Sequence, residues 1–143
     1  MKKFLMPTMI ILVLGLPTLG GWWLYRFNVA EGAGYAEEKC GGCHDLTNQK
    51  KNDRGPYLWG IVNRRAAVVP GFEYSDAFLQ FAGARKFSWS EANLDLFITD
   101  PGRLIPGTKM ADDQGDQTHR KAFEGIKELE NRQKLITFLR TLK

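Results

Sequence analysis

The sequence predicts an all-α domain that is preceded by a single N-terminal transmembrane helix. An uncharged, mostly apolar run from Phe4 to Tyr25 has the length and composition of a membrane-spanning helix. Ser88-Trp89-Ser90-Glu91 has the pattern of a capping box, and the helix that it begins should end at Pro101. Near the end of the chain, apolar residues recur with a helical period at Leu135, Ile136, Phe138, Leu139 and Leu142.

The apolar run predicts a single-pass anchor. A helix of about 22 residues, at ~1.5 Å per residue, spans about 33 Å and therefore crosses the hydrocarbon core. Lys2 and Lys3 precede the run, which predicts that the N-terminus stays in the cytoplasm and that the domain lies on the periplasmic side of the inner membrane. Trp22 and Trp23 stand at its far end, where an interfacial aromatic belt is expected.

A cleaved signal peptide is the alternative interpretation of the same run. Thr18-Leu19-Gly20 could serve as a poor cleavage site, but the apolar run continues beyond it through Tyr25. We therefore expect residues 1–30 to form an anchor with a short linker and residues 31–143 to form the domain. An extended linker from Phe27 to Ala33 would reach roughly 25 Å and would let the domain swivel near the membrane.

The charge of the domain argues against a nucleic-acid partner. The chain has 20 basic and 16 acidic residues and a formal net charge of +4. Lys2, Lys3 and Arg26 lie before the first acidic residue, and without them 17 basic residues face the 16 acidic ones. A nearly neutral domain without a basic stripe is a poor partner for a phosphate backbone.

The segment Cys40-Gly41-Gly42-Cys43-His44 has the pattern of a covalent heme-attachment site. A helical turn can present two thiols to the two vinyl groups of one heme, and the adjacent histidine then faces the iron as an axial ligand. A short helix from Tyr35 to Lys39 should lead into this segment. We therefore expect one covalently attached heme c.

Three other uses of the two cysteines are weaker. A disulfide between Cys40 and Cys43 would close a very small loop and stabilise little. A thioredoxin-like site needs a strand before the first cysteine, and no β-branched run precedes Cys40. A zinc site needs about four ligands, so His119 or a carboxylate would have to complete it.

A second iron ligand is available from the Pro- and Gly-rich segment Pro101–Met110. A thioether is a soft, neutral ligand that raises the reduction potential of a heme relative to two histidines. We expect this segment to be a stiff, non-helical loop that ends on Met110, where a methionine has no obvious role as core filler.

From about residue 32 to residue 143 the chain resembles class I cytochromes c, in particular the mitochondrial-like and α-proteobacterial branch. The resemblance also extends to the membrane-anchored cytochromes c. The motifs that carry it, in addition to Cys40–His44, are Gly55-Pro56-Tyr57-Leu58-Trp59-Gly60, Pro70-Gly71-Phe72-Glu73-Tyr74-Ser75-Asp76-Ala77, Trp89 and Ile105-Pro106-Gly107-Thr108-Lys109-Met110. It implies the class I cytochrome c fold around one covalent heme.

The resemblance also implies roles for individual residues. His44 and Met110 would be the axial ligands, and the carbonyl of Pro56 would accept a hydrogen bond from the other ring nitrogen of His44. The remaining implied heme contacts are to the propionates, which would otherwise be uncompensated carboxylates. These contacts are Arg64, Tyr74 and Trp89 at the inner propionate and Thr108 at the other.

The chain departs from this family in three places. Phe97 stands where a tyrosine commonly bonds the methionine sulfur, and Ala36 stands where an aromatic residue is expected before the first cysteine. The family places Phe-x-Gly-Ile-Lys almost directly after the methionine, whereas here Phe123–Lys127 follows an insert of about eleven residues, from Ala111 to Lys121. The insert is either a solvated loop or a reshaped docking face, and His119 within it is a weak alternative to Met110 as ligand.

The function implied is that of an electron carrier and not of an enzyme. We expect a membrane-tethered one-electron carrier between respiratory or photosynthetic complexes, such as a quinol–cytochrome c reductase and a terminal oxidase. The alternative is a permanent heme-bearing subunit of a larger respiratory or dehydrogenase complex. A peroxidase or a small-molecule sensor would need an open sixth position on the iron, which Met110 argues against, and no small-molecule substrate is expected.

Overall fold

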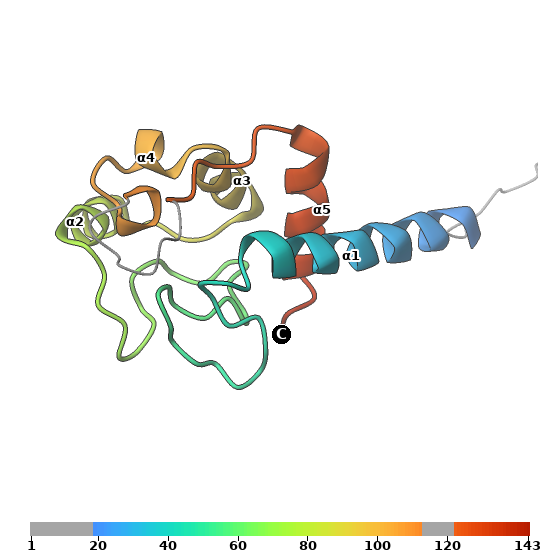
Figure 1. Ribbon diagram of the computed structural model, residues 1–143, viewed down its shortest axis with the longest axis horizontal. Coiled ribbons are helices and arrows are strands. Elements are labelled where there is room, and N and C mark those ends of the chain that lie inside the picture. Colours follow the sequence, from blue (N-terminus) through green and yellow to red (C-terminus); the bar gives the residue numbers. More distant parts are fainter. Residues whose placement is uncertain (1–18, 113–121) are drawn as a thin grey trace, which may run out of the picture.

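The computed structural model describes residues 19–112 and 122–143, and its regular structure is helical (Figure 1). Within these two ranges no strand forms, and an isolated bridge pairs Arg65 with Ser88. The helices are α1 (Leu19–Lys39), α2 (Asp76–Arg85), α3 (Glu91–Thr99), α4 (Pro101–Leu104), the 3₁₀ turn η1 (Lys109–Ala111) and α5 (Leu129–Leu139). The all-α prediction is confirmed for this part of the chain.

α1 is much longer than the sequence predicted. The short helix expected from Tyr35 to Lys39 is only the last part of α1, and the segment from Phe27 to Ala33, expected to be an extended linker, is helical. Residues 4–18 of the predicted anchor lie outside the described residues. Of the helices described, none is both long and apolar enough to span a bilayer.

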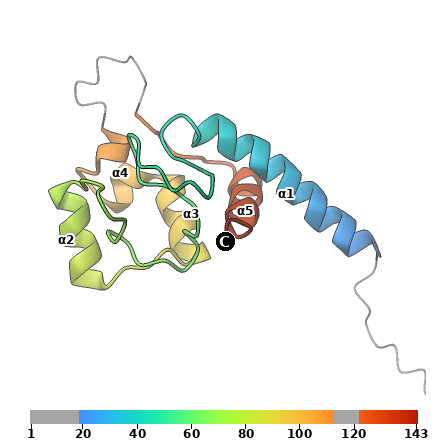
Figure 2. The same ribbon diagram turned by 90° about the horizontal axis from the view of Figure 1, so that it is seen from below.

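α1 packs across α5 (Figure 2). This contact explains why the segment from Phe27 to Ala33 is helical. Gly32 lies at the crossing, where a Cβ atom would overlap the backbone carbonyl of Lys134. Ala36, one turn later, is fully buried, so the small residue in place of the expected aromatic one allows a close crossing. Glu31 adds an ion pair of 2.6 Å to Lys134, which also pairs with Glu130 at 2.7 Å.

Serine caps begin α2 and α3. The Ser75 hydroxyl accepts a hydrogen bond from the backbone N–H of Phe78, so α2 is a capped helix that the sequence analysis missed. Ser90, and not Ser88, caps α3 by accepting from the N–H of Asn93. The predicted capping box is therefore wrong by two residues, because the chain at Ser88 is extended in its bridge to Arg65.

The segment from Pro101 to Met110 is not the non-helical loop that was predicted. α3 does end before Pro101, but Pro101 then occupies the first turn of α4, where its missing N–H costs nothing. The carboxylate of Asp100 caps this turn through the N–H of Arg103. Met110 itself lies in the 3₁₀ turn η1.

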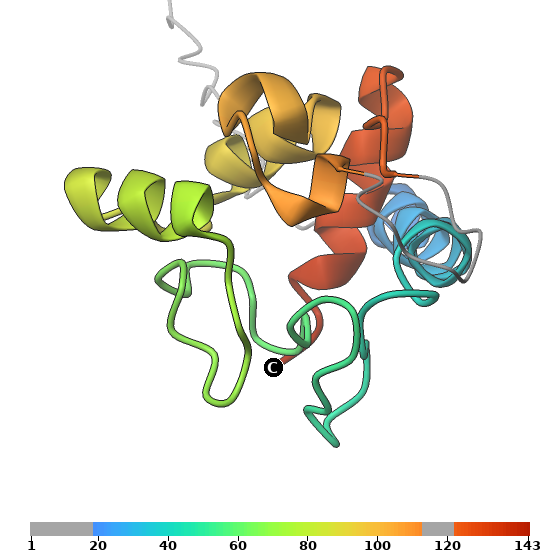
Figure 3. The same ribbon diagram turned by 60° about the vertical axis from the view of Figure 1, so that its left-hand side comes forward.

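α5 separates α1 from the other helices, which lie on its opposite side (Figure 3). The apolar period predicted near the chain end is confirmed, since Leu135, Ile136 and Leu139 are buried in the core. Arg132, on the same helix, is also buried, and its Nε donates to Asp95 of α3 at 2.7 Å. This ion pair joins α5 to α3. It also gives the buried Arg132 cation a partner, without which its burial would be costly.

We predict that Gly32→Ala destabilises the protein and that Gly34→Ala does not. The added methyl at Gly32 meets the Lys134 backbone and should force α1 away from α5, at a cost of about 1–3 kcal/mol in the free energy of unfolding. A Cβ at Gly34 meets nothing within 4 Å, so alanine there should stabilise the helix by up to ~1 kcal/mol. Denaturant unfolding of both variants measures the difference, and effects of the same sign would contradict the close crossing.

Candidate heme-attachment site

The cysteine motif forms a further turn that continues α1. The N–H of Cys40 donates to the carbonyl of Ala36 at 2.8 Å, and the N–H groups of Cys43 and His44 both donate to the carbonyl of Cys40 at 2.9 Å. Residues three or four apart on such a turn share one face, so Cys43 and His44 both lie on the same side of the chain as Cys40. The turn thus offers both thiols and the imidazole to one neighbouring group.

Both cysteines are free thiols, Cys40 buried and Cys43 half-buried. Burial raises the pKa of the Cys40 thiol to about 12, so it is held protonated. A zinc site needs thiolates, and such burial opposes them. Within the described ranges, no three His, Cys, Asp or Glu side chains gather as a metal site; His119 lies outside them.

The imidazole of His44 has a fixed orientation. Its Nδ1 lies 2.7 Å from the carbonyl oxygen of Pro56, which is the hydrogen bond that the resemblance implied. Burial lowers the pKa of His44, so the ring is neutral; Nδ1 then carries the proton and donates it, and Nε2 keeps its lone pair. The ring is therefore prepared to bind a metal through Nε2.

Gly55 makes the seat of this ring, and the sequence analysis gave it no role. Its N–H donates to the carbonyl of Cys43 at 2.8 Å, and a Cβ atom here would overlap the imidazole of His44. The signal was present in the sequence, since Gly55 directly precedes the proline that accepts the His44 proton. Any side chain at this position would displace the ring.

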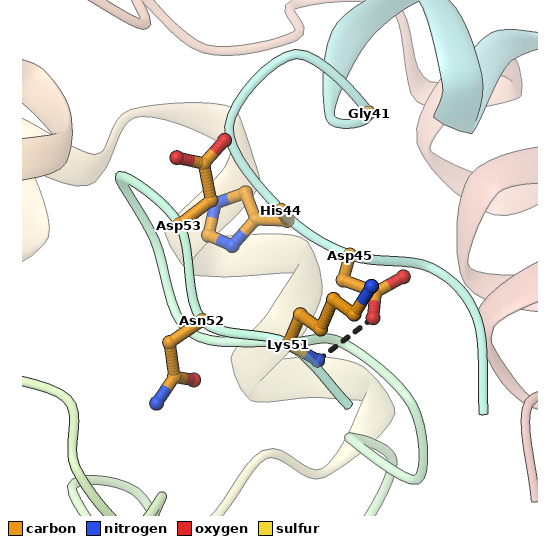
Figure 4. Close-up of a pocket in the computed structure, with 6 residues that line it drawn as sticks. All are labelled: Gly41, His44, Asp45, Lys51, Asn52 and Asp53. Carbon is orange, nitrogen blue, oxygen red and sulfur yellow. Dashed lines mark hydrogen bonds between the residues drawn. The ribbon is translucent and has the colours of Figure 1, made fainter. Parts of the chain in front are cut away.

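A polar pocket beside His44 is not the place for a heme. Figure 4 shows its lining, which includes the half-buried Asp45 and the exposed Lys51, Asn52 and Asp53. The dashed line in the figure is the bond from the N–H of Lys51 to Asp45, 2.8 Å long, which closes the loop that follows His44. A flat apolar ring needs apolar walls, and those are provided by the core on which Cys40 packs.

Arg64 has one donor without a partner. Its Nη1 and Nη2 donate to the carbonyls of Trp59 and Tyr57 at 3.0 and 2.8 Å, but its buried Nε has no hydrogen-bond partner. A buried cationic N–H of this kind calls for an acceptor, and an anionic oxygen is the best one. An inner heme propionate would supply that oxygen.

Three other residues expected at the propionates lie in or against the core. Trp89 is buried. Its backbone N–H donates to the carbonyl of Arg64 at 2.8 Å, which brings the two residues together. The hydroxyl of Tyr74 accepts from the N–H of Val69 at 3.3 Å, so its own proton remains available for donation. Thr108 is buried and makes no capping bond to η1.

Met110 packs against the same core as Cys40 and is held by its own backbone. Its carbonyl accepts the N–H of Phe123 at 3.0 Å, which joins the residues on either side of the insert. The chain beyond is fixed to α3, since the N–H of Ile126 donates to the carbonyl of Ile98 at 2.7 Å. Phe97 is buried against Trp89 at 5.0 Å between ring centroids and offers no hydroxyl to the Met110 sulfur.

These residues fit one covalently bound heme. The chain offers two free thiols on one turn, a neutral imidazole with a free nitrogen, a buried cation that lacks an anion and a thioether on the same core. Such a group, when bound, supplies a reversible one-electron couple between ferric and ferrous iron.

Known proteins identify the family. No family model matches the chain. It is 34% identical to cytochrome c of Euglena viridis over 107 residues, which are 75% of this chain and 89% of the relative. The chain belongs to the cytochrome c family. It carries one covalent c-type heme, and it is a heme-based electron carrier of the class I fold.

With two bacterial relatives the alignment covers a smaller share of this chain, of the relative or of both. It is 34% identical to the protein named cytochrome c-type cyt cy of Rhodobacter capsulatus, over 72% of this chain but only 43% of the relative. It is 42% identical to cytochrome c2 of Rhodoblastus acidophilus, over 50% of this chain and 64% of the relative. The cytochrome is thus similar to proteins named cytochrome c, cytochrome c2 and cytochrome cy.

We predict that Gly55→Ala damages the heme site of the cytochrome without disturbing its helices. The methyl should push the His44 ring off the Pro56 carbonyl and lower the free energy of unfolding by about 1–3 kcal/mol. Gly83→Ala in α2 is the matched control, since a Cβ there meets nothing within 4 Å. Chemical unfolding and the visible spectrum measure both effects, and a Gly55→Ala protein with the wild-type spectrum and stability would contradict the proposed seat.

Proposed function

We propose that the protein is a membrane-tethered one-electron carrier whose heme iron has His44 and Met110 as its axial ligands. The neutral His44 ring, whose free nitrogen is Nε2, supports the first ligand. The position of Met110 in η1, against the core that contains Cys40, supports the second. The partnerless Nε of Arg64 supports a propionate beside it, with Tyr74 and Trp89 near and Thr108 at the other propionate.

The apolar end of α1 is the observation that carries the proposed membrane attachment. From Gly20 to Phe27 every residue of α1 is exposed, and the exposed fraction reaches 72% at Trp23. At ~100° per residue, the large apolar side chains from Trp22 to Phe27 point to all sides of the helix. A helix end that is apolar all round is suited to lipid and not to water.

The sequence before α1 continues the same pattern. Residues 4–18 contain no charged residue, and Lys2 and Lys3 precede them. Arg26 stacks over the ring of Trp22 at 4.8 Å, which suits a position where the headgroups begin. We therefore propose a single pass through the inner membrane, with the heme domain on the periplasmic side.

A tethered carrier needs partners in the same membrane. Tethering replaces diffusion from solution with a high local concentration, so the docking face can remain small and weak. We propose that electrons pass from a quinol–cytochrome c reductase to a terminal oxidase. The second candidate function is that of a permanent subunit of one complex. The extraction experiment below distinguishes the two.

We predict that the protein stays with membranes after alkaline carbonate extraction and that mild detergent releases it without a fixed partner. The lipid-facing end of α1 explains the first result, and the role of a carrier explains the second. Co-purification with one complex at constant stoichiometry would instead identify a subunit. Release by carbonate would contradict the anchor.

We predict that Met110→Ala opens the sixth position of the iron. The variant should bind cyanide and carbon monoxide rapidly and should have a lower reduction potential, because the thioether is lost. Lys109→Ala, at the exposed neighbour in η1, is the matched control and should keep the wild-type spectrum. An unchanged spectrum and potential in Met110→Ala would contradict Met110 as the ligand.

A further inference from the structure

α1 runs from the apolar N-terminal segment into the domain, where the sequence predicted an extended linker between the two. Its N-terminal end, from Gly20 to Phe27, is exposed on all sides, and its contact with the domain begins at the half-buried Asn28 and Val29. Figures 1 and 2 show this end projecting beyond α5. α1 remains a continuous helix where its exposed end meets the part that packs on the domain.

Gly20 and Gly21 begin the projecting part of α1, and the rest of that part has no residue that would let it bend. The sequence from Trp22 to Glu31 contains neither glycine nor proline, the usual causes of a kink. Gly32 and Gly34, which weaken a helix, come only after the contact with α5 has begun. α1 is therefore stiff from Trp22 to Glu31, and the glycines that follow lie where α5 supports the helix.

The other end of α1 is fixed in the domain. Gly32 lies against the Lys134 backbone and Ala36 is fully buried, so α1 cannot turn or slide on α5 without a clash. The Glu31 carboxylate holds Lys134 at 2.6 Å on the same side. These contacts fix both the direction and the rotation of α1 relative to the domain.

The heme-attachment turn is part of the same rod. Cys40 follows α1 without a break, through its hydrogen bond to Ala36. Between Phe27 and Cys40 the helix rises by about 20 Å, at ~1.5 Å per residue. The apolar end and the attachment turn are thus at a set distance and a set angle.

We infer that α1 is a rigid stalk that holds the heme domain at a fixed height and tilt above the lipid bilayer. The inference rests on the proposed membrane attachment of residues before Phe27. A fixed tilt presents one face of the domain to partners in the same membrane. Docking then costs less orientational freedom than it does for a domain on a flexible linker.

Two insertions of equal length between Phe27 and Asn28 test the stalk in the full-length protein. One insertion is a seven-residue segment of alanine and lysine, which continues the helix by about 700°, close to two full turns. The other is seven glycine and serine residues, which form a flexible chain. Neither changes the contact of α1 with α5, and unchanged heme spectra and resistance to carbonate show that each variant is folded and attached.

The readout is the linear dichroism of the heme absorption in oriented membranes, which reports the tilt of the heme plane. The wild-type protein and the helical insertion should be dichroic to the same degree, whereas the glycine–serine insertion should lose its dichroism. Absence of dichroism in the wild-type protein, its loss in the helical variant or its persistence in the flexible variant would each overturn the stalk. Release of the wild-type protein by carbonate would overturn the proposed attachment and the stalk with it.

Discussion

The close crossing of α1 and α5 at Gly32 positions the heme-attachment turn that follows α1. Only a residue without a side chain lets α1 lie against the Lys134 backbone, and this contact holds the last turns of α1 on α5. The attachment turn continues directly from that end, so Cys40 enters the core in one orientation. His44 follows one turn later and reaches Pro56. The position of His44, the proposed iron ligand, therefore depends on helix packing some distance away.

The second half of the site depends on backbone hydrogen bonds more than on side chains. The turn that contains Met110 is tied to Phe123, and the chain beyond Phe123 is tied to α3 through Ile126 and Ile98. The residues on either side of the insert, Met110 and Phe123, are therefore joined directly. This arrangement explains how the chain accepts extra residues beside Met110, the proposed ligand, since a longer connection adds only slowly to the cost of closure.

Much of the site could be predicted from the sequence, because local chemistry determines it. The Cys40–His44 motif predicted the cofactor, and the helical period of apolar residues near the end of the chain predicted α5. The start of α3 could not be predicted, because Ser88 and Ser90 offer equivalent caps and only the bridge to Arg65 selects between them. The length of α1 was also hidden, since Asn28, Gly32 and Gly34 are poor helix formers. Packing on α5 outweighs their propensity.

The proposed site holds one covalent heme between His44 and Met110. Near-infrared magnetic circular dichroism of the oxidised, full-length protein at neutral pH can identify both axial ligands, because the charge-transfer band of low-spin ferric heme shifts with their identity. We expect one band at the position of histidine–methionine ligation. A band at the position of two nitrogen ligands, or the spectrum of a high-spin iron, would contradict it.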